Sequence, residues 1–188
     1  MTPEQRKLIF GCTSGEISVE ELVARLGVDP RHDRELVPTQ LRESLANRSL
    51  DDVECALRLA FKFKLSRHWA PTFAALLDED WHFSHEDLAS CLQDIRDPAT
   101  VDALYRCALK RLSYLAYDEA YALAVKCIWA LHDIGTSAAV ERLESLASCD
   151  VEPIREAASE RLRALAQRQA DDPVPAYRRA RDAKMRSF

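Results

Sequence analysis

Glycine is scarce in this chain, and its scarcity excludes the common phosphate-binding loops. Only four glycines occur among 188 residues, at positions 11, 15, 27 and 135. The patterns G-x-x-x-x-G-K and G-x-G-x-x-G need closely spaced glycines, because the backbone must approach the phosphates. Neither is present, and G-x-S-x-G and H-E-x-x-H are absent too. These absences weigh against an enzyme, so we assign no catalytic residue and no cofactor.

Long apolar runs are also missing. Apolar residues make up 47% of the chain, yet no stretch approaches the roughly 18 uninterrupted ones that a membrane span needs. The first residues, MTPEQRKLIFGC, lack the basic and then apolar order of a secretory signal. We therefore expect a soluble cytoplasmic protein without a membrane partner.

Close cysteine pairs are the third absence. Six cysteines are scattered along the chain and form no C-x-x-C pair, at positions 12, 55, 91, 107, 127 and 149. Such spacing is typical of reduced thiols rather than of a disulfide framework. The stretch WHFSHED places His82 and His85 three residues apart, but on either side of an expected helix start at Ser84. We interpret it as a turn and a first helical turn, not as a metal site.

The residues that are abundant, Ala, Leu, Glu and Arg, predict an all-α protein. Helix starts are indicated by the serine and carboxylate pairs that begin at Ser18, Ser49 and Ser84, and by Asp97 followed by Pro98. Apolar residues then recur at intervals of three and four. The expected N-terminal helices cover residues 3–12, 18–27, 35–47, 50–65 and 69–78, and five more follow from Leu88 to Leu165.

The second half of the chain repeats itself. IRDPATVDAL, residues 95–104, aligns with IGTSAAVERL, residues 134–143, and Leu131 aligns with Leu162 at a spacing of 31 residues. The repeating unit is a helical hairpin, which cannot bury its apolar face alone. Stacked hairpins bury a continuous core and expose an extended surface, and such a surface suits binding.

LAVKCIWALHDIG and IREAASERLRALA, residues 123–135 and 154–166, resemble the second helix of HEAT-type repeats, in the short form of bilin-lyase-like proteins. The resemblance runs from about residue 84 to 166 and extends back to about residue 50. It implies a right-handed α-solenoid of antiparallel helix pairs over residues 49–168. Residues 1–48 would then form an N-terminal helical cap, and residues 169–188 a basic C-terminal tail.

Charge is distributed unevenly along the chain. Residues 176–188 carry five basic side chains and Asp182, a net charge of +4, whereas the whole chain carries −5. The remaining residues therefore carry −9. An acidic body attracts basic partners and repels nucleic acid.

Trp129 is the most informative single residue. Flanking repeats have Ser90 and Glu160 at its position, so the tryptophan either fills a gap between repeats or is an exposed anchor for a partner. Acidic residues are expected on the same stripe and one position beside it, and Tyr121 near its edge. The predicted partner-binding residues are Trp129, Tyr121, Glu86, Asp87, Asp94, Asp133, Glu156 and Glu160.

Two classes of function remain. The first is a non-catalytic module that binds a basic protein, because small acidic HEAT-like proteins resemble bacterial immunity proteins, which neutralise toxins stoichiometrically. An adaptor or chaperone would have the same features. The second is a nucleic-acid enzyme, because DNA glycosylases of the alkylpurine type also have HEAT-like folds, although their binding surface is basic.

Overall fold

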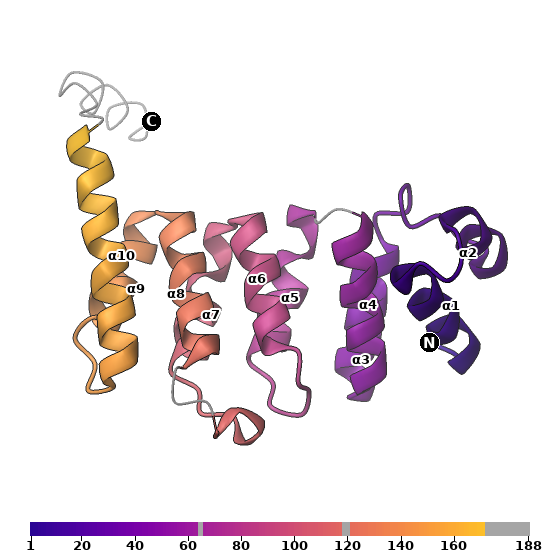
Figure 1. Ribbon diagram of the computed structural model, residues 1–188, viewed down its shortest axis with the longest axis horizontal. Helices are drawn as coiled ribbons and strands as arrows, with labels where there is room; N and C mark the ends of the chain where they lie inside the picture. The colour runs from indigo at the N-terminus through magenta and orange to yellow at the C-terminus, as the bar shows by residue number, and fades with distance from the viewer. Residues whose placement is uncertain (64–65, 118–120, 172–188) are drawn as a thin grey trace.

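The computed structural model describes residues 1–63, 66–117 and 121–171, and this part of the chain is all-α, as predicted (Figure 1). It contains ten α-helices and no strand. The helices are α1 Pro3–Ser14, α2 Val19–Leu26, α3 Leu36–Asn47, α4 Leu50–Phe63, α5 Ala70–Leu77, α6 His85–Ile95, α7 Val101–Ala108, α8 Ala122–Ile134, α9 Ser137–Leu146 and α10 Glu152–Asp171. Short 3-10 helices lie at Arg67–Trp69, Pro98–Thr100 and Ser113–Leu115. Most of the basic tail lies outside the described residues.

Two of the predicted helix starts have the expected side-chain caps. The Ser18 hydroxyl accepts a hydrogen bond from the Glu21 amide at 3.1 Å, and the Asp97 carboxylate accepts from the Ala99 amide at 3.0 Å. Ser84 is different, because its side chain caps nothing and its own amide donates to Nδ1 of His82 at 3.2 Å. The helix start predicted at Ser84 is confirmed, because α6 begins at His85, but the predicted capping box does not form, since His82 and not Asp87 accepts the Ser84 amide.

The repeat seen in the sequence extends to the turns between helices. Arg96 and Gly135 follow the aligned residues Ile95 and Ile134, and both end their helices in the left-handed conformation, with φ of 54° and 62°. The next residues again match in role, because Asp97 and Thr136 each accept a backbone amide hydrogen bond at the following helix start. Equivalent positions thus end one helix and cap the next in the same way, even where the residue type changes.

The helices from α3 onward stand in a row of pairs, with α1 and α2 at one end and α10 at the other (Figure 1). One layer, here the first layer, consists of α3, α5, α7 and α9, and the second layer consists of α4, α6, α8 and α10. Within each layer a helix packs on the next, and each pair packs across the layers. None of the described helices has the length and apolarity needed to cross a bilayer.

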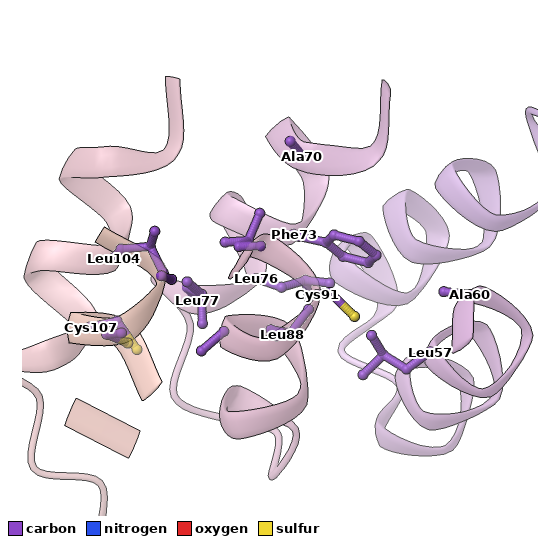
Figure 2. Packing of buried hydrophobic residues seen from close by; sticks show 14 of the residues in the cluster. Leu57, Ala60, Ala70, Phe73, Leu76, Leu77, Leu88, Cys91, Leu104 and Cys107 are labelled. Carbon is purple, nitrogen blue, oxygen red and sulfur yellow. The ribbon is translucent and has the colours of Figure 1, made fainter. Parts of the chain in front are cut away.

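The core runs between the layers along the whole row. Figure 2 shows Phe73 and Leu76 of α5 beside Leu88 of α6 and Leu57 of α4, and all four side chains are buried. Leu131 of α8 is fully buried as well. Its predicted equivalent in α10, Leu162, is only half-buried, because no described helix packs on the outer side of α10. The alignment of Leu131 with Leu162 therefore does not extend to equal burial at this end of the row.

Candidate protein-binding surface

Trp129 lies on α8, where the residue is 43% exposed. It borders a groove between α8 and α10, so it does not fill a closed gap between helices. The guanidinium of Arg161 from α10 stands over the ring, 4.4 Å from its centroid, and is also paired with Glu160. One face of the aromatic ring is therefore already occupied by a cation of the same chain. The groove is lined by Val125, Trp129, Pro153, Glu156, Ala157, Glu160, Arg161 and Arg163.

The strongest negative charge of the second layer lies on α6, the helix that packs against α8. Glu86, Asp87 and Asp94 lie on α6, which contains no lysine or arginine. Glu86 pairs with Lys126 of α8 at 3.1 Å and so links the two helices. Asp87 and Asp94 are exposed, and neither has an ion-pair partner among the described residues. These two carboxylates are free to meet a cation from outside.

Asp133 is less available than its position in the sequence suggests. Its side chain accepts a hydrogen bond from Gln93 of α6 at 2.8 Å and lies 2.9 Å from Nδ1 of His132. Burial alone would raise the pKa of Asp133, but the hydrogen bonds from Gln93 and His132 outweigh burial and hold the pKa below its usual value. Asp133 thus ties α8 to α6, and only 19% of its side chain is exposed.

The acidic residues of α10 are balanced by arginines. This helix carries four carboxylates and four arginines over Glu152–Asp171. Glu156 and Glu160 line the groove, but so do Arg161 and Arg163. The predicted acidic stripe is therefore uneven, with its net charge on α6 and a mixed surface at α10.

Tyr121 does not share the groove with Trp129. It precedes α8, about 12 Å along the helix axis from Trp129 at 1.5 Å per residue. Its ring lies under Arg111, whose guanidinium is 4.2 Å from the ring centroid. The small hollow around it is lined by Lys110, Arg111, Leu112, Leu115, Tyr121, Leu123 and Ala124. Among the predicted site residues, Tyr121 thus lies away from the Trp129 groove and next to the basic residues Lys110 and Arg111.

The first layer has a different surface. Arg106 pairs with Asp78 at 2.6 Å, and Arg142 pairs with Asp102 at 2.8 Å, so each pair joins neighbouring helices of this layer. Arg142 also covers the ring of Tyr105, 4.9 Å from its centroid. The helices of the first layer present no large exposed aromatic residue in the described part of the chain.

Two exposed aromatic residues lie in the connections between helices, where helical periodicity gives no signal. Phe83 precedes α6 and is 64% exposed, and Tyr117 follows the 3-10 helix Ser113–Leu115 and is 82% exposed. Sequence reasoning did not single out Phe83. The only usable signal was its place in WHFSHED, where His82 and His85 drew attention instead.

His82 and His85 are committed to hydrogen bonds inside the protein. Nε2 of His82 donates to the Leu76 carbonyl at 2.9 Å, and Nε2 of His85 donates to the Glu79 carbonyl at 2.8 Å. Within the described ranges, no group of three or more His, Cys, Asp or Glu side chains is arranged so that it could hold a metal ion.

Comparisons of the chain with protein-family models, with curated proteins and with solved structures gave no match.

Proposed function

We propose that this protein is a non-catalytic binding module for a basic protein, and most concretely a stoichiometric inhibitor of the immunity type that covers a toxin. The observation that carries the proposal is the exposed Trp129 on α8, together with the unpaired carboxylates Asp87 and Asp94 on α6, the helix that packs against α8 in the second layer. An aromatic residue at the centre of an interface contributes much of the binding energy, whereas surrounding charges mainly speed association.

The proposal includes a finer description of the fold. We propose that the helix pairs from α3 onward form a right-handed α-solenoid of HEAT-like repeats, with residues 1–48 as an N-terminal cap. The matched helix ends at Arg96 and Gly135 support repetition of one unit. In such an array the second layer presents a continuous surface to a partner, because each helix of that layer adds one row of side chains.

Arg161 refines the role of Trp129. In the free protein the Trp129 ring is partly covered by this guanidinium, which Glu160 holds in turn. A partner arginine can take the same place over the ring, because the groove offers Glu156 as a further carboxylate. Binding would then exchange one stacked guanidinium for another and release Arg161 to solvent.

A DNA glycosylase of the HEAT-like type is the alternative from another class. Such an enzyme grips phosphates with a basic surface, and each phosphate contact releases counterions. The second layer of this protein has the opposite charge at α6, and α10 is balanced. An adaptor or chaperone for a basic protein would use the same surface as an inhibitor, so it differs only in what the partner does afterwards.

The proposal is tested by capturing partners from the native cell with the full chain at low and at moderate salt. We expect a basic protein bound in a one-to-one ratio, with less captured at higher salt. The matched baits are Asp87→Asn with Asp94→Asn in the second layer, and Glu141→Gln with Glu144→Gln in the first layer. The proposal is supported if the bait with Asp87→Asn and Asp94→Asn captures less of the basic protein and the bait with Glu141→Gln and Glu144→Gln does not. Equal capture by both baits, or capture of nucleic acid instead, contradicts it.

A further inference from the structure

Two aromatic side chains meet where two connections of the row approach each other. Phe83 and Tyr114 form an edge-to-face contact with ring centroids 5.1 Å apart, and Tyr117 follows one short turn later. We call Phe83, Tyr114 and Tyr117 the aromatic edge. The connection between α5 and α6 and the connection between α7 and α8 lie at the same end of the helices, at the bottom of Figure 1. The edge is separate from the groove at Trp129.

A buried histidine pair fixes the shape of the aromatic edge. Nδ1 of His85 accepts a hydrogen bond from the Tyr114 hydroxyl at 3.0 Å, and Nδ1 of His82 accepts from the Ser84 amide at 3.2 Å. The two imidazole rings stack on each other beneath the edge. Lys110 secures the same connection, because its ammonium donates to the Leu77 and Glu79 carbonyls. Phe83 is therefore held in place before any partner arrives, so little conformational entropy is lost on binding.

Carboxylates surround the aromatic edge. Burial raises the pKa of the Tyr114 phenol to about 12, and the negative charges of Glu86 and Asp87 in the first turn of α6 add to this rise. Asp80 is exposed in the connection that leads to Phe83 and has no ion-pair partner in the described part of the chain. The edge thus combines exposed aromatic rings with the unpaired carboxylates Asp80 and Asp87, while the nearby ammonium of Lys110 is held by the Leu77 and Glu79 carbonyls.

We propose that the aromatic edge binds arginine side chains of an extended segment of the partner, with Phe83 and Tyr117 under the guanidinium groups and Asp80 and Asp87 beside them. This inference rests on the proposed function, because it specifies how a basic protein would be recognised. The planar guanidinium stacks on an aromatic face while its N–H groups reach carboxylates, which a lysine ammonium does less well.

The same arrangement occurs within the chain. Arg161 stands over Trp129 while it pairs with Glu160, and Arg111 stands over Tyr121. In both cases the guanidinium belongs to the protein itself. Phe83 and Tyr117 are more exposed than Trp129, and no cation stands over either ring in the described residues.

The test uses a labelled synthetic peptide with three arginines separated by glycines, and a second peptide with lysines in their place. Each is titrated into the full-length protein while backbone amide shifts and the dissociation constant are measured. We expect the arginine peptide to shift amides of residues 80–87 and 113–117. We expect it to bind about two- to fivefold more tightly than the lysine peptide of equal charge, from the strength of a solvent-exposed cation–aromatic contact.

Phe83→Ala and Tyr117→Ala should each weaken the arginine peptide about two- to fivefold. Phe61→Ala is the matched control, because Phe61 is an aromatic residue of α4 that is 50% exposed and lies elsewhere. It should leave affinity unchanged. The proposal is overturned if the shifts centre on the groove at Trp129, or if both peptides bind equally and Phe83→Ala has no effect. Since neither peptide is the cellular partner, this result is independent of whether the capture experiment finds a basic protein.

Discussion

His82 and His85 stack with their ring centroids 4.1 Å apart, although both side chains are fully buried. Each Nε2 faces a carbonyl oxygen, which only accepts, so each Nε2 carries the proton. Each Nδ1 accepts a hydrogen bond, from the Ser84 amide or the Tyr114 hydroxyl. Both rings are therefore neutral in the folded protein, and a second proton on either would break a hydrogen bond.

The first prediction concerns acid. Burial lowers the pKa of His85 to about 4 and lowers that of His82, with further lowering from Lys110. The unfolded chain binds these protons near pH 6.5, so the stabilising effect of the neutral rings is complete above that pH. It is lost as the pH falls from about 6.5 towards 4, and His85 alone accounts for about 3 kcal/mol of unfolding free energy. Denaturant unfolding at several pH values measures this slope.

His85→Gln tests the assignment, because glutamine can donate to the Glu79 carbonyl but does not titrate. This variant should be less stable at pH 7 and should have a flatter dependence on pH between 6.5 and 4. His32→Gln is the control, since the His32 side chain is 81% exposed. If His85→Gln keeps the slope of the unmodified protein, the histidine pair is not the cause of acid sensitivity.

The second prediction compares the two matched helix ends. Gly135 and Arg96 have nearly the same positive φ, which glycine adopts freely and other residues adopt at a cost of about 1–2 kcal/mol. Gly135→Ala should lower the free energy of unfolding by about 1 kcal/mol. Arg96→Gly should raise it or leave it unchanged, because the unfavourable conformation is already present there. Thermal unfolding measures both effects. If Arg96→Gly destabilised the protein and Gly135→Ala did not, the two turns would not be equivalent.

The third prediction follows from unequal burial in the last two pairs. Leu131→Ala should destabilise the protein by about 2–5 kcal/mol, because Leu131 is fully buried. Leu162→Ala should cost clearly less, since Leu162 is half-buried at the end of the row. Equal losses for both would contradict the unequal burial of the two side chains.

Local signals in the sequence predicted much of the fold. Helical periodicity and caps such as Ser18 depend on residues within one or two turns, so they could be recognised without the structure. The Ser84 cap was predicted wrongly, because nothing local indicates that the His82 ring takes the Ser84 amide. The N-terminal helices agree with the prediction to within a few residues.

The site was less predictable, because its contacts join helices that are distant in the sequence. Asp133 is bound by Gln93 at a separation of 40 residues, and Trp129 is covered by Arg161 of another helix. Such contacts depend on how one helix pair is rotated against the next. Sequence charge alone therefore overestimated how many carboxylates are free for a partner.

The fourth prediction separates a protein-binding function from a nucleic-acid enzyme. The full chain should bind duplex DNA no better than a weak non-specific ligand at physiological salt, because α6 brings carboxylates rather than cations to the phosphates. Binding is measured by titration at several salt concentrations. Tight, salt-sensitive binding that survives removal of residues 172–188 would favour the enzyme.

The most direct test of the protein-binding surface is kinetic, with the partner identified by capture. Trp129→Ala should lower the melting temperature only slightly, because Trp129 is 43% exposed and loses mainly its contact with Arg161, and it should dissociate faster by a factor that corresponds to about 2–4 kcal/mol. Asp87→Asn with Asp94→Asn should slow association and flatten its dependence on salt, whereas Glu141→Gln with Glu144→Gln should not. An unchanged dissociation rate for Trp129→Ala, together with normal association of the Asp87 and Asp94 variant at low salt, would contradict the account and place the partner elsewhere on the protein.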